Sequence, residues 1–177
     1  PQQTVCGSCH QLQTKGFQSG KHGMRIAAGL SPMTPAQARI PMRAEASHRE
    51  LTCTTCHTAH KFDTRAAAVE ACLGCHGDEH SLAYERSEHA RLWRAEVAGD
   101  APPGTGVSCA SCHMPRLEHR HLDFDLKQIY VEHNQNSTLR PNEKMIRPVC
   151  MQCHGYGFAV DALADSALIR TNFNGEP

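Results

Sequence analysis

The segment Cys72-Leu-Gly-Cys75-His76 carries the pattern on which the whole chain is built. Two residues separate the two cysteines, and a histidine follows the second. Five segments have this form: Cys6-Gly-Ser-Cys9-His10, Cys53-Thr-Thr-Cys56-His57, Cys72-Leu-Gly-Cys75-His76, Cys109-Ala-Ser-Cys112-His113 and Cys150-Met-Gln-Cys153-His154. At the chain's own cysteine and histidine frequencies, chance would produce roughly 0.04 such segments. All ten cysteines belong to the pattern, so it reflects a single chemistry repeated five times.

That chemistry is the covalent attachment of c-type haem. The two thiols add to the two vinyl groups of one porphyrin, and the adjoining imidazole becomes the proximal ligand of the iron. The sequence therefore predicts five covalently attached haem c groups. Their proximal ligands would be His10, His57, His76, His113 and His154.

Other uses of paired cysteines explain the pattern less well. Two such pairs close one four-sulfur zinc site, so five pairs would leave one pair over. A disulfide framework or a thioredoxin-like redox pair gives no reason for a histidine after every second cysteine.

The composition favours a fold that is filled by cofactors. Only 5% of the 177 residues are aromatic, and the mean hydropathy is negative. Five haems leave about 35 residues for each, which is too few to wrap them separately. We therefore expect residues 1–177 to form a single pentahaem cytochrome c domain. It would be mainly α with extensive loop and little or no sheet, a haem stack in a thin peptide coat that is not stable without haem.

The charge balance argues against some classes of binding partner. Eighteen Lys and Arg residues balance eighteen Asp and Glu residues, so the polypeptide has no net attraction to nucleic acid. No apolar run is long enough to span a membrane. Pro1 cannot be a translation start, and haem attachment requires export, so we expect a periplasmic or extracellular protein whose signal peptide has been removed. Its partners would be redox proteins that donate and accept electrons.

Eight further histidines could supply the sixth ligand of each iron. Six are candidates for this distal position: His22, His48, His60, His80, His89 and His133. Ligation of every iron by two histidines would give low reduction potentials, because a thioether ligand stabilises the reduced metal more. His119 and His121 stand in a charged run, and whether either takes part stays open.

The coarse pattern is helical, with loops rich in proline and glycine. We expect helices over 64–76 and 79–98, the second ending at Gly99. His89 and Trp93 would share a face of the second helix. A shorter helix is expected over 36–47.

Two runs resemble a known family. They are Ala71-Cys72-Leu-Gly-Cys75-His76-Gly-Asp-Glu-His80 with the following Ser87-Glu88-His89-Ala90, and Gly106-Val-Ser-Cys109-Ala-Ser-Cys112-His113-Met114-Pro115. They resemble multihaem cytochromes related to hydroxylamine oxidoreductase and pentahaem nitrite reductase, over roughly residues 48–155. The resemblance implies that His80 and His89 are distal ligands, and it places His133 where relatives often have one.

The chain departs from the enzymes of that family. Its nitrite reductases typically have lysine in place of the motif histidine at the catalytic haem, whereas all five motifs here end in histidine. The hydroxylamine oxidoreductases have more haems and a cross-linked tyrosine, and this chain has only Tyr84, Tyr130 and Tyr156. Its size and motif count resemble the small pentahaem electron carriers.

Three functions follow as hypotheses. The first is an electron-transfer protein that passes single electrons along five closely packed, mostly bis-histidine haems, with no catalytic residue. The second is a small oxidoreductase acting on a nitrogen or sulfur oxyanion at one five-coordinate haem. The third is a subunit of a haem-stacked filament or electron-transfer complex.

Overall fold

The computed structural model describes residues 2–61, 64–121 and 126–175, and the side chain of His121 lies outside the described part. The α-helices are α1 (Gln2–Gly7), α2 (Gln11–Ser19), α3 (Met24–Ala27), α4 (Cys53–Cys56), α5 (Thr64–Ala68), α6 (Glu70–Leu73), α7 (Glu79–Ala83), α8 (Glu88–Ala98), α9 (Cys109–His113), α10 (Asn136–Leu139), α11 (Tyr156–Ala164) and α12 (Ser166–Arg170). Short 3-10 helices are η1 (Pro35–Gln37), η2 (Ala44–Ala46), η3 (Tyr84–Arg86), η4 (Asn142–Met145) and η5 (Cys150–Gln152).

The cysteine motifs form helical turns. In four of them the backbone N–H of the histidine donates to the carbonyl of the first cysteine, at His10, His57, His76 and His154, with distances of 2.8 to 3.1 Å. The fifth motif is helix α9 itself. A helical turn brings residues three apart onto one side, so both thiols of a motif face the same way.

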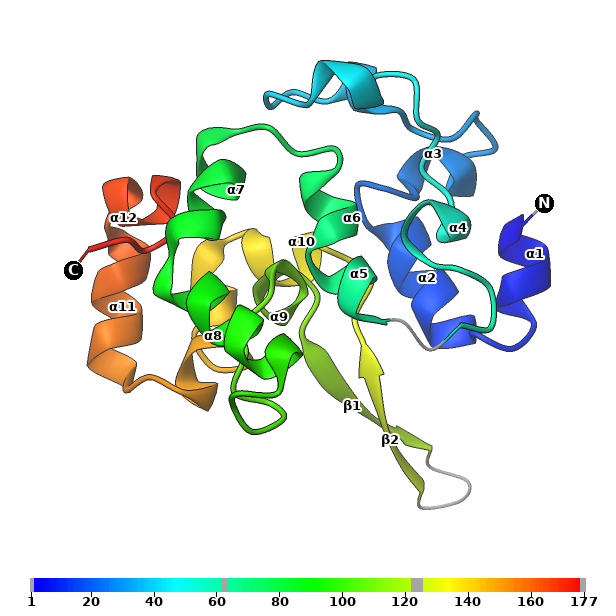
Figure 1. Cartoon of the computed structure of the whole chain (residues 1–177). Helices are drawn as coiled ribbons and strands as arrows, with labels where there is room; N and C mark the ends of the chain where they lie inside the picture. Colours follow the sequence, from blue (N-terminus) through cyan, green and yellow to red (C-terminus); the bar gives the residue numbers. More distant parts are fainter. Residues whose placement is uncertain (1, 62–63, 122–125, 176–177) are drawn as a thin grey trace.

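A hairpin projects from the helical body (Figure 1). Strands β1 (Arg116–His121) and β2 (Leu126–Val131) pair antiparallel, in register from Arg116 with Val131 to His121 with Leu126. The backbone N–H of Glu132 donates to the carbonyl of Pro115 at 3.0 Å, which closes the base of the hairpin. Within the described residues this is the only sheet, so the prediction of a mainly α fold with little sheet is confirmed.

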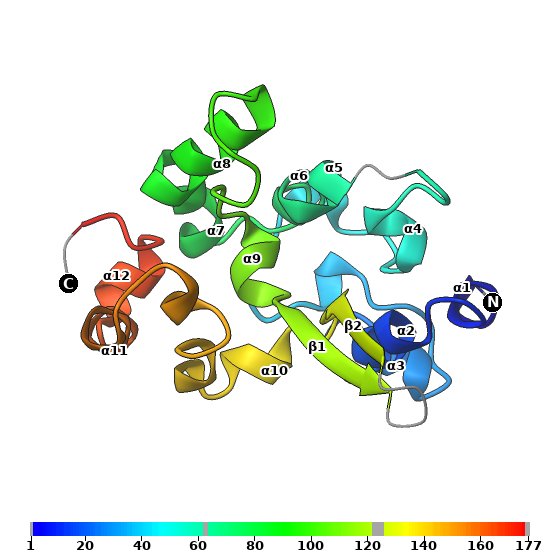
Figure 2. The same cartoon turned by 90° about the horizontal axis from the view of Figure 1, so that it is seen from below.

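The chain crosses the molecule from end to end in roughly sequence order (Figures 1 and 2). Helices α1 to α4 lie at the N-terminal end, α11 and α12 lie at the C-terminal end, and the two termini are far apart in both views. Each motif therefore occupies its own stretch of the body.

The protein core is made of small side chains. Its buried apolar residues include Ala46, Ala83, Ala90, Ala159 and Ala162, and no large side chain of the described residues is less than 2% exposed. One cluster joins Val69, Tyr84 and Ala90, with Trp93 packed against it. This core buries little apolar area for a chain of 177 residues.

Two predicted helices are interrupted, and the third is absent. The helix predicted over 79–98 breaks at Ser87, whose hydroxyl accepts from the backbone N–H of Ala90 and starts α8. His80 and His89 therefore lie on separate helices. The helix predicted over 64–76 divides into α5 and α6, and the segment 36–47 holds only the end of the 3-10 helix η1 and the whole of the short 3-10 helix η2.

Candidate cofactor-binding site

Eight histidines form four close ring pairs. Each pair joins one motif histidine to one histidine from elsewhere in the chain. The ring centroids lie 6.2 Å apart in His22–His76, 6.1 Å in His57–His133, 5.9 Å in His80–His113 and 6.2 Å in His89–His154. Thus four of the six predicted distal histidines stand opposite a predicted proximal one.

The first pair is held by a tight turn after α2. A Cβ at Gly23 would clash with the backbone carbonyl of Phe17, so only glycine lets the chain pass there. Burial, and then the neighbouring His76, lowers the pKa of His22 to about 4. On the other ring, His76 Nδ1 lies 3.7 Å from a carboxylate oxygen of Asp78. Near neutral pH, His22 is therefore held as the neutral imidazole that a metal requires.

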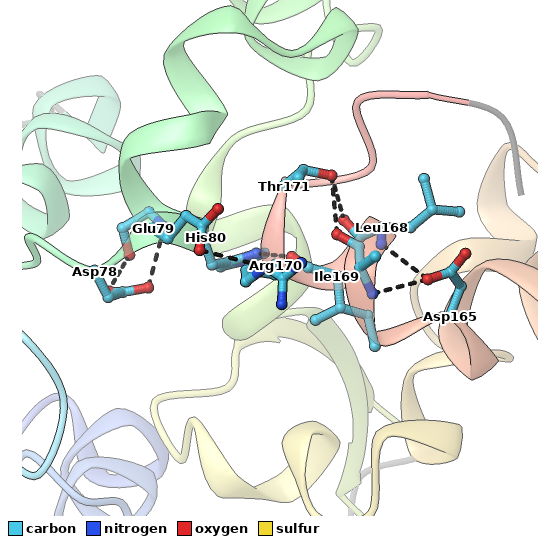
Figure 3. A network of polar contacts seen from close by, with 10 residues as sticks. Asp78, Glu79, His80, Asp165, Leu168, Ile169, Arg170 and Thr171 are labelled. Atoms are coloured by element: carbon cyan, nitrogen blue, oxygen red, sulfur yellow. Dashed lines mark hydrogen bonds and ion pairs between the residues drawn. The ribbon is translucent and has the colours of Figure 1, made fainter.

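In the pair His80–His113, His80 is held by a distant part of the chain, the segment around Ile169 (Figure 3). His80 Nδ1 makes a short hydrogen bond with the backbone carbonyl of Ile169 in α12. Since a carbonyl only accepts, Nδ1 carries the proton and Nε2 keeps its lone pair. The side-chain amide of Asn172 donates to the carbonyl of His80 at 3.1 Å. Burial, and then His80, lowers the pKa of His113 to about 4.

The pair His57–His133 uses the base of the hairpin. His133 Nδ1 donates to the carbonyl of Val131 at 2.8 Å, which again leaves Nε2 as the free nitrogen. Burial is the main cause that lowers the pKa of His133. Backbone carbonyls that fix the tautomer in this way are common partners of metal-bound histidines.

Aromatic side chains flank the pair His89–His154. His89 is the second residue of α8, after the capping residue Ser87. Phe158 stacks on His154 with centroids 4.7 Å apart and planes 17° from parallel. Phe173 meets His89 edge-on at 6.5 Å. Each imidazole of this pair is thus in contact with a phenylalanine ring.

The other candidate histidines are not paired in this way. The structure brings neither His48 nor His60 into ring contact with another described imidazole, and both are exposed. His60 has a positive φ of 57°, which is uncommon for a residue other than glycine. His119 meets the ring of Tyr130 on the hairpin, with centroids 6.5 Å apart.

His10 is the motif histidine without a ring partner among the described residues. It lies close enough to His57 and His133 to contribute to lowering the pKa of each, after burial as the main cause. The first motif is therefore next to the second in space.

The cysteines of successive motifs are also neighbours. Burial, followed by Cys6, raises the pKa of Cys53, and burial followed by Cys72 raises that of Cys56 to about 11. A hydrogen bond with Cys109 raises the pKa of Cys72. Burial, and then the nearby Cys150, raises the pKa of Cys112 to about 12. The five motifs thus adjoin one another in chain order, and none of the ten thiols is in a disulfide.

The spacing of the ring pairs fits an iron ligated on both sides. A metal–nitrogen bond of about 2 Å and the half-width of an imidazole, taken twice, separate two ring centroids by roughly 6 Å. The four observed distances run from 5.9 to 6.2 Å. Each pair offers two nitrogen ligands, which suits a metal whose other four ligands come from a macrocycle. The described residues contain no group of three or more His, Cys, Asp or Glu side chains arranged to hold a bare metal ion.

Some of the supporting groups could not be found from the sequence. The carbonyls of Ile169 and Val131 are backbone groups, and Ile169 stands 89 residues from the histidine that it contacts. Phe158 and Phe173 belong to no sequence motif, although Phe158 stands only four residues after the motif histidine His154 whose ring it contacts.

Two family models match the chain. Residues 45–173 match the family model of cytochrome c3, and residues 5–71 match that of cytochrome c554 and c-prime. Repeated attachment motifs with paired imidazoles define a multihaem c-type cytochrome, an electron-transfer protein with covalently bound haem c. The chain belongs to the cytochrome c3 family, whose model covers more than half of it.

One curated relative is similar over most of the chain. It is a cytochrome c-552 of Haemophilus ducreyi (strain 35000HP / ATCC 700724), 25% identical over 171 residues, which are 84% of this chain and 32% of the relative. The chain thus spans about a third of the length of that relative. No solved structure matches the chain. Among the described residues, no helix is both long and apolar enough to cross a membrane.

Proposed function

We propose that residues 1–177 form one pentahaem domain that passes single electrons along five haem c groups. Four of the irons would have two histidine ligands each. Haem, when bound, supplies the one-electron chemistry of ferric and ferrous iron. The polypeptide attaches the cofactors, spaces them and sets their potentials through ligand type and burial. The ten motif cysteines make the attachments, and each motif histidine is the proximal ligand.

The four ring pairs carry the proposal. On their distances we propose His133 as distal ligand opposite His57, His22 opposite His76, His80 opposite His113, and His89 opposite His154. Two of the four, His80 and His133, present Nε2 because their Nδ1 atoms are bonded to carbonyls. Two imidazole ligands give a low reduction potential.

The order of the attachment sites supports a linear path. Cys6 adjoins Cys53, Cys56 adjoins Cys72, Cys72 adjoins Cys109 and Cys112 adjoins Cys150. The first and fifth motifs therefore stand at the two ends of the row. Electrons would enter at one end and leave at the other.

The ends of the row are where we place contact with partner proteins. At the fifth motif, Met151 and the nearby Tyr156 are 45% and 63% exposed. An exposed apolar surface of this kind suits a short-lived redox contact, with another protein or with the end of a second copy. We place the protein in the periplasm or outside the cell, because haem attachment to these motifs requires export. We also propose kinship with the hydroxylamine oxidoreductase and pentahaem nitrite reductase superfamily.

A second candidate function rests on His10. None of the described imidazoles pairs with it, so we propose His48, His60, a hairpin histidine or an exchangeable small molecule as the sixth ligand at the first motif. The last case would make the first haem a site for reduction or oxidation of a nitrogen or sulfur oxyanion. Our first choice is a histidine, with His48 and His60 as the candidates.

Mass spectrometry and ligand addition test both candidates. The intact holo-protein should be heavier than its residues by five haems, and any other number contradicts the proposal. The oxidised protein should be low-spin at no fewer than four haems. A high-spin signal from one haem that disappears on adding nitrite or cyanide would favour the enzyme, and His48→Ala and His60→Ala should each be tested for creating such a signal.

A further inference from the structure

The turn formed by Asn172 and Phe173, directly after α12, contacts two other helices. The side-chain amide of Asn172 donates to the carbonyl of His80 in α7 at 3.1 Å. The ring of Phe173 meets that of His89 in α8 edge-on, with centroids 6.5 Å apart. His80 and His89 belong to different ring pairs, those of the fourth and fifth motifs. Two adjacent residues of one turn therefore contact the distal candidates of two sites.

This turn has an unusual backbone. Asn172 and Phe173 have positive φ angles of 57° and 58°. The left-handed region is unfavourable for residues other than glycine; asparagine tolerates it better than most, whereas a bulky aromatic residue does not. Such a conformation persists only where the surrounding contacts fix it, and it is common at functional sites. Two such residues in succession indicate that the directions of both side chains matter.

Contacts on two sides hold the turn in place. Toward α12, the backbone N–H of Phe173 donates to the carbonyl of Leu168 at 2.6 Å. Leu168 and Asn172 are buried, at 7% and 8% exposed. Toward α7, the side-chain amide of Asn174 donates to the carbonyl of Ala83 at 3.2 Å, and α12 itself packs against α7. The turn is therefore a fixed link between α12 and α7.

The histidine rings that this turn contacts need support from outside the metal. In the ring pairs of the fourth and fifth motifs, the two ring planes meet at 79° and 61°. A metal–nitrogen bond leaves an imidazole free to rotate about it, so neighbouring groups fix the orientation of the ring. For His80 these groups are the carbonyl of Ile169, bonded to Nδ1, and Asn172, bonded to its backbone (Figure 3). The bond at Nδ1 also makes the ring a stronger donor to the metal.

We propose that Asn172 and Phe173 are positioning residues for electron transfer, with Asn172 setting the orientation of the His80 ring and Phe173 that of the His89 ring. The inference rests on the proposed function, in which these two imidazoles are distal ligands of the fourth and fifth haems. A single turn then sets the ligand geometry, and through it the potentials, of two neighbouring haems.

Electron paramagnetic resonance and redox titration of the holo-protein test this role. Asn172→Gly removes the amide but keeps the backbone turn, because glycine accepts a positive φ. Phe173→Leu removes the ring and keeps an apolar side chain. Thr171→Val is the matched control, since the Thr171 hydroxyl donates to the carbonyls of Ala167 and Leu168 within α12. Intact mass verifies the haem number of each variant.

The two substitutions should act on different haems. The g values of a low-spin ferric haem depend on the angle between its two imidazole planes. Asn172→Gly should shift the signal of the fourth haem and raise its midpoint potential, because a weaker bond at Nδ1 makes His80 a weaker donor to ferric iron. Phe173→Leu should shift the signal of the fifth haem. Thr171→Val should change neither signal.

The signals of the fourth and fifth haems are identified as those lost in His80→Ala and in His89→Ala. If either substitution leaves every low-spin signal in place, the ligand assignment in the proposed function is wrong. If both signals are lost there, but Asn172→Gly and Phe173→Leu leave signals and potentials unchanged or affect only one of the two haems, the positioning role is overturned. Equal shifts in Thr171→Val would also overturn it, because they would reflect a general loosening of α12.

Discussion

Replacement of His80 by alanine should open one iron and leave the rest of the protein intact. The ring of His80 lies 5.9 Å from that of His113, and no other described imidazole makes a ring pair with His113. His80→Ala therefore removes one ligand from one haem of five. In the ferric holo-protein we expect a high-spin signal that integrates to one haem in five, and added imidazole should remove it by filling the vacated position.

His80→Ala should destabilise the protein only slightly, so the folded variant can be studied by spectroscopy. The substitution also loses the hydrogen bond from His80 Nδ1 to the carbonyl of Ile169. A bond of this kind contributes about 1 kcal/mol net. For a chain of this size that corresponds to a fall in Tm of roughly 2–4 °C. The variant should therefore remain folded with all its haems, which intact mass verifies.

The adjacent residue offers the matched control. Glu79 forms an ion pair with Arg170 at 3.3 Å, and both side chains are more than half exposed (Figure 3). Exposed pairs of this kind contribute little to stability. Glu79→Ala should leave the low-spin spectrum unchanged. If His80→Ala stays fully low-spin with unchanged potentials, His80 is not an iron ligand. The proposal that each ring pair supplies the two histidine ligands of one iron would then be wrong.

Four further predictions concern other parts of the molecule. His89→Met should raise the midpoint potential of a single haem, since a thioether favours ferrous iron; an unaltered redox titration would show that His89 is not bound to iron. Gly23→Ala should disturb the turn that holds the adjacent histidine and lower Tm, whereas Gly157→Ala, where a Cβ meets nothing within 4 Å, should be neutral or slightly stabilising; equal Tm values for the two would contradict the close approach. Tyr84→Phe removes a 2.8 Å hydrogen bond from a residue only 5% exposed, and it should cost about 1–2 kcal/mol in thermal or denaturant unfolding. The polypeptide made without haem should show little helix by circular dichroism, and a native-like spectrum would mean that the protein core suffices.

The haem-attachment motifs could be predicted from the sequence because they depend only on the spacing of residues along the chain. The motif Cys109-Ala-Ser-Cys112-His113 needs only one helical turn to present both thiols, and that turn is formed. The mainly α fold followed from the same reasoning, since few residues per cofactor leave room only for short helices and loops.

The sequence could not predict which distal histidine lies opposite which motif histidine, because these pairs depend on contacts between distant segments of the chain. His22 stands 54 residues before its partner His76, and His133 stands 76 residues after His57. The break between His80 and His89 was missed because the helical pattern continues through Ser87, where a capping hydroxyl starts a new helix. The hairpin was missed because residues 116–121 are polar except for Leu117, and they form a strand only by pairing with residues 126–131.

The central claim is that paired imidazoles ligate most of the irons, and near-infrared magnetic circular dichroism of the fully oxidised holo-protein tests it most directly. The charge-transfer bands of ferric haem differ between two histidine ligands, histidine with methionine, and a single histidine. The account predicts bands of the two-histidine type with the intensity of at least four haems per chain. Intensity for three or fewer such haems, or a methionine-type band from any of the four paired sites, would contradict it.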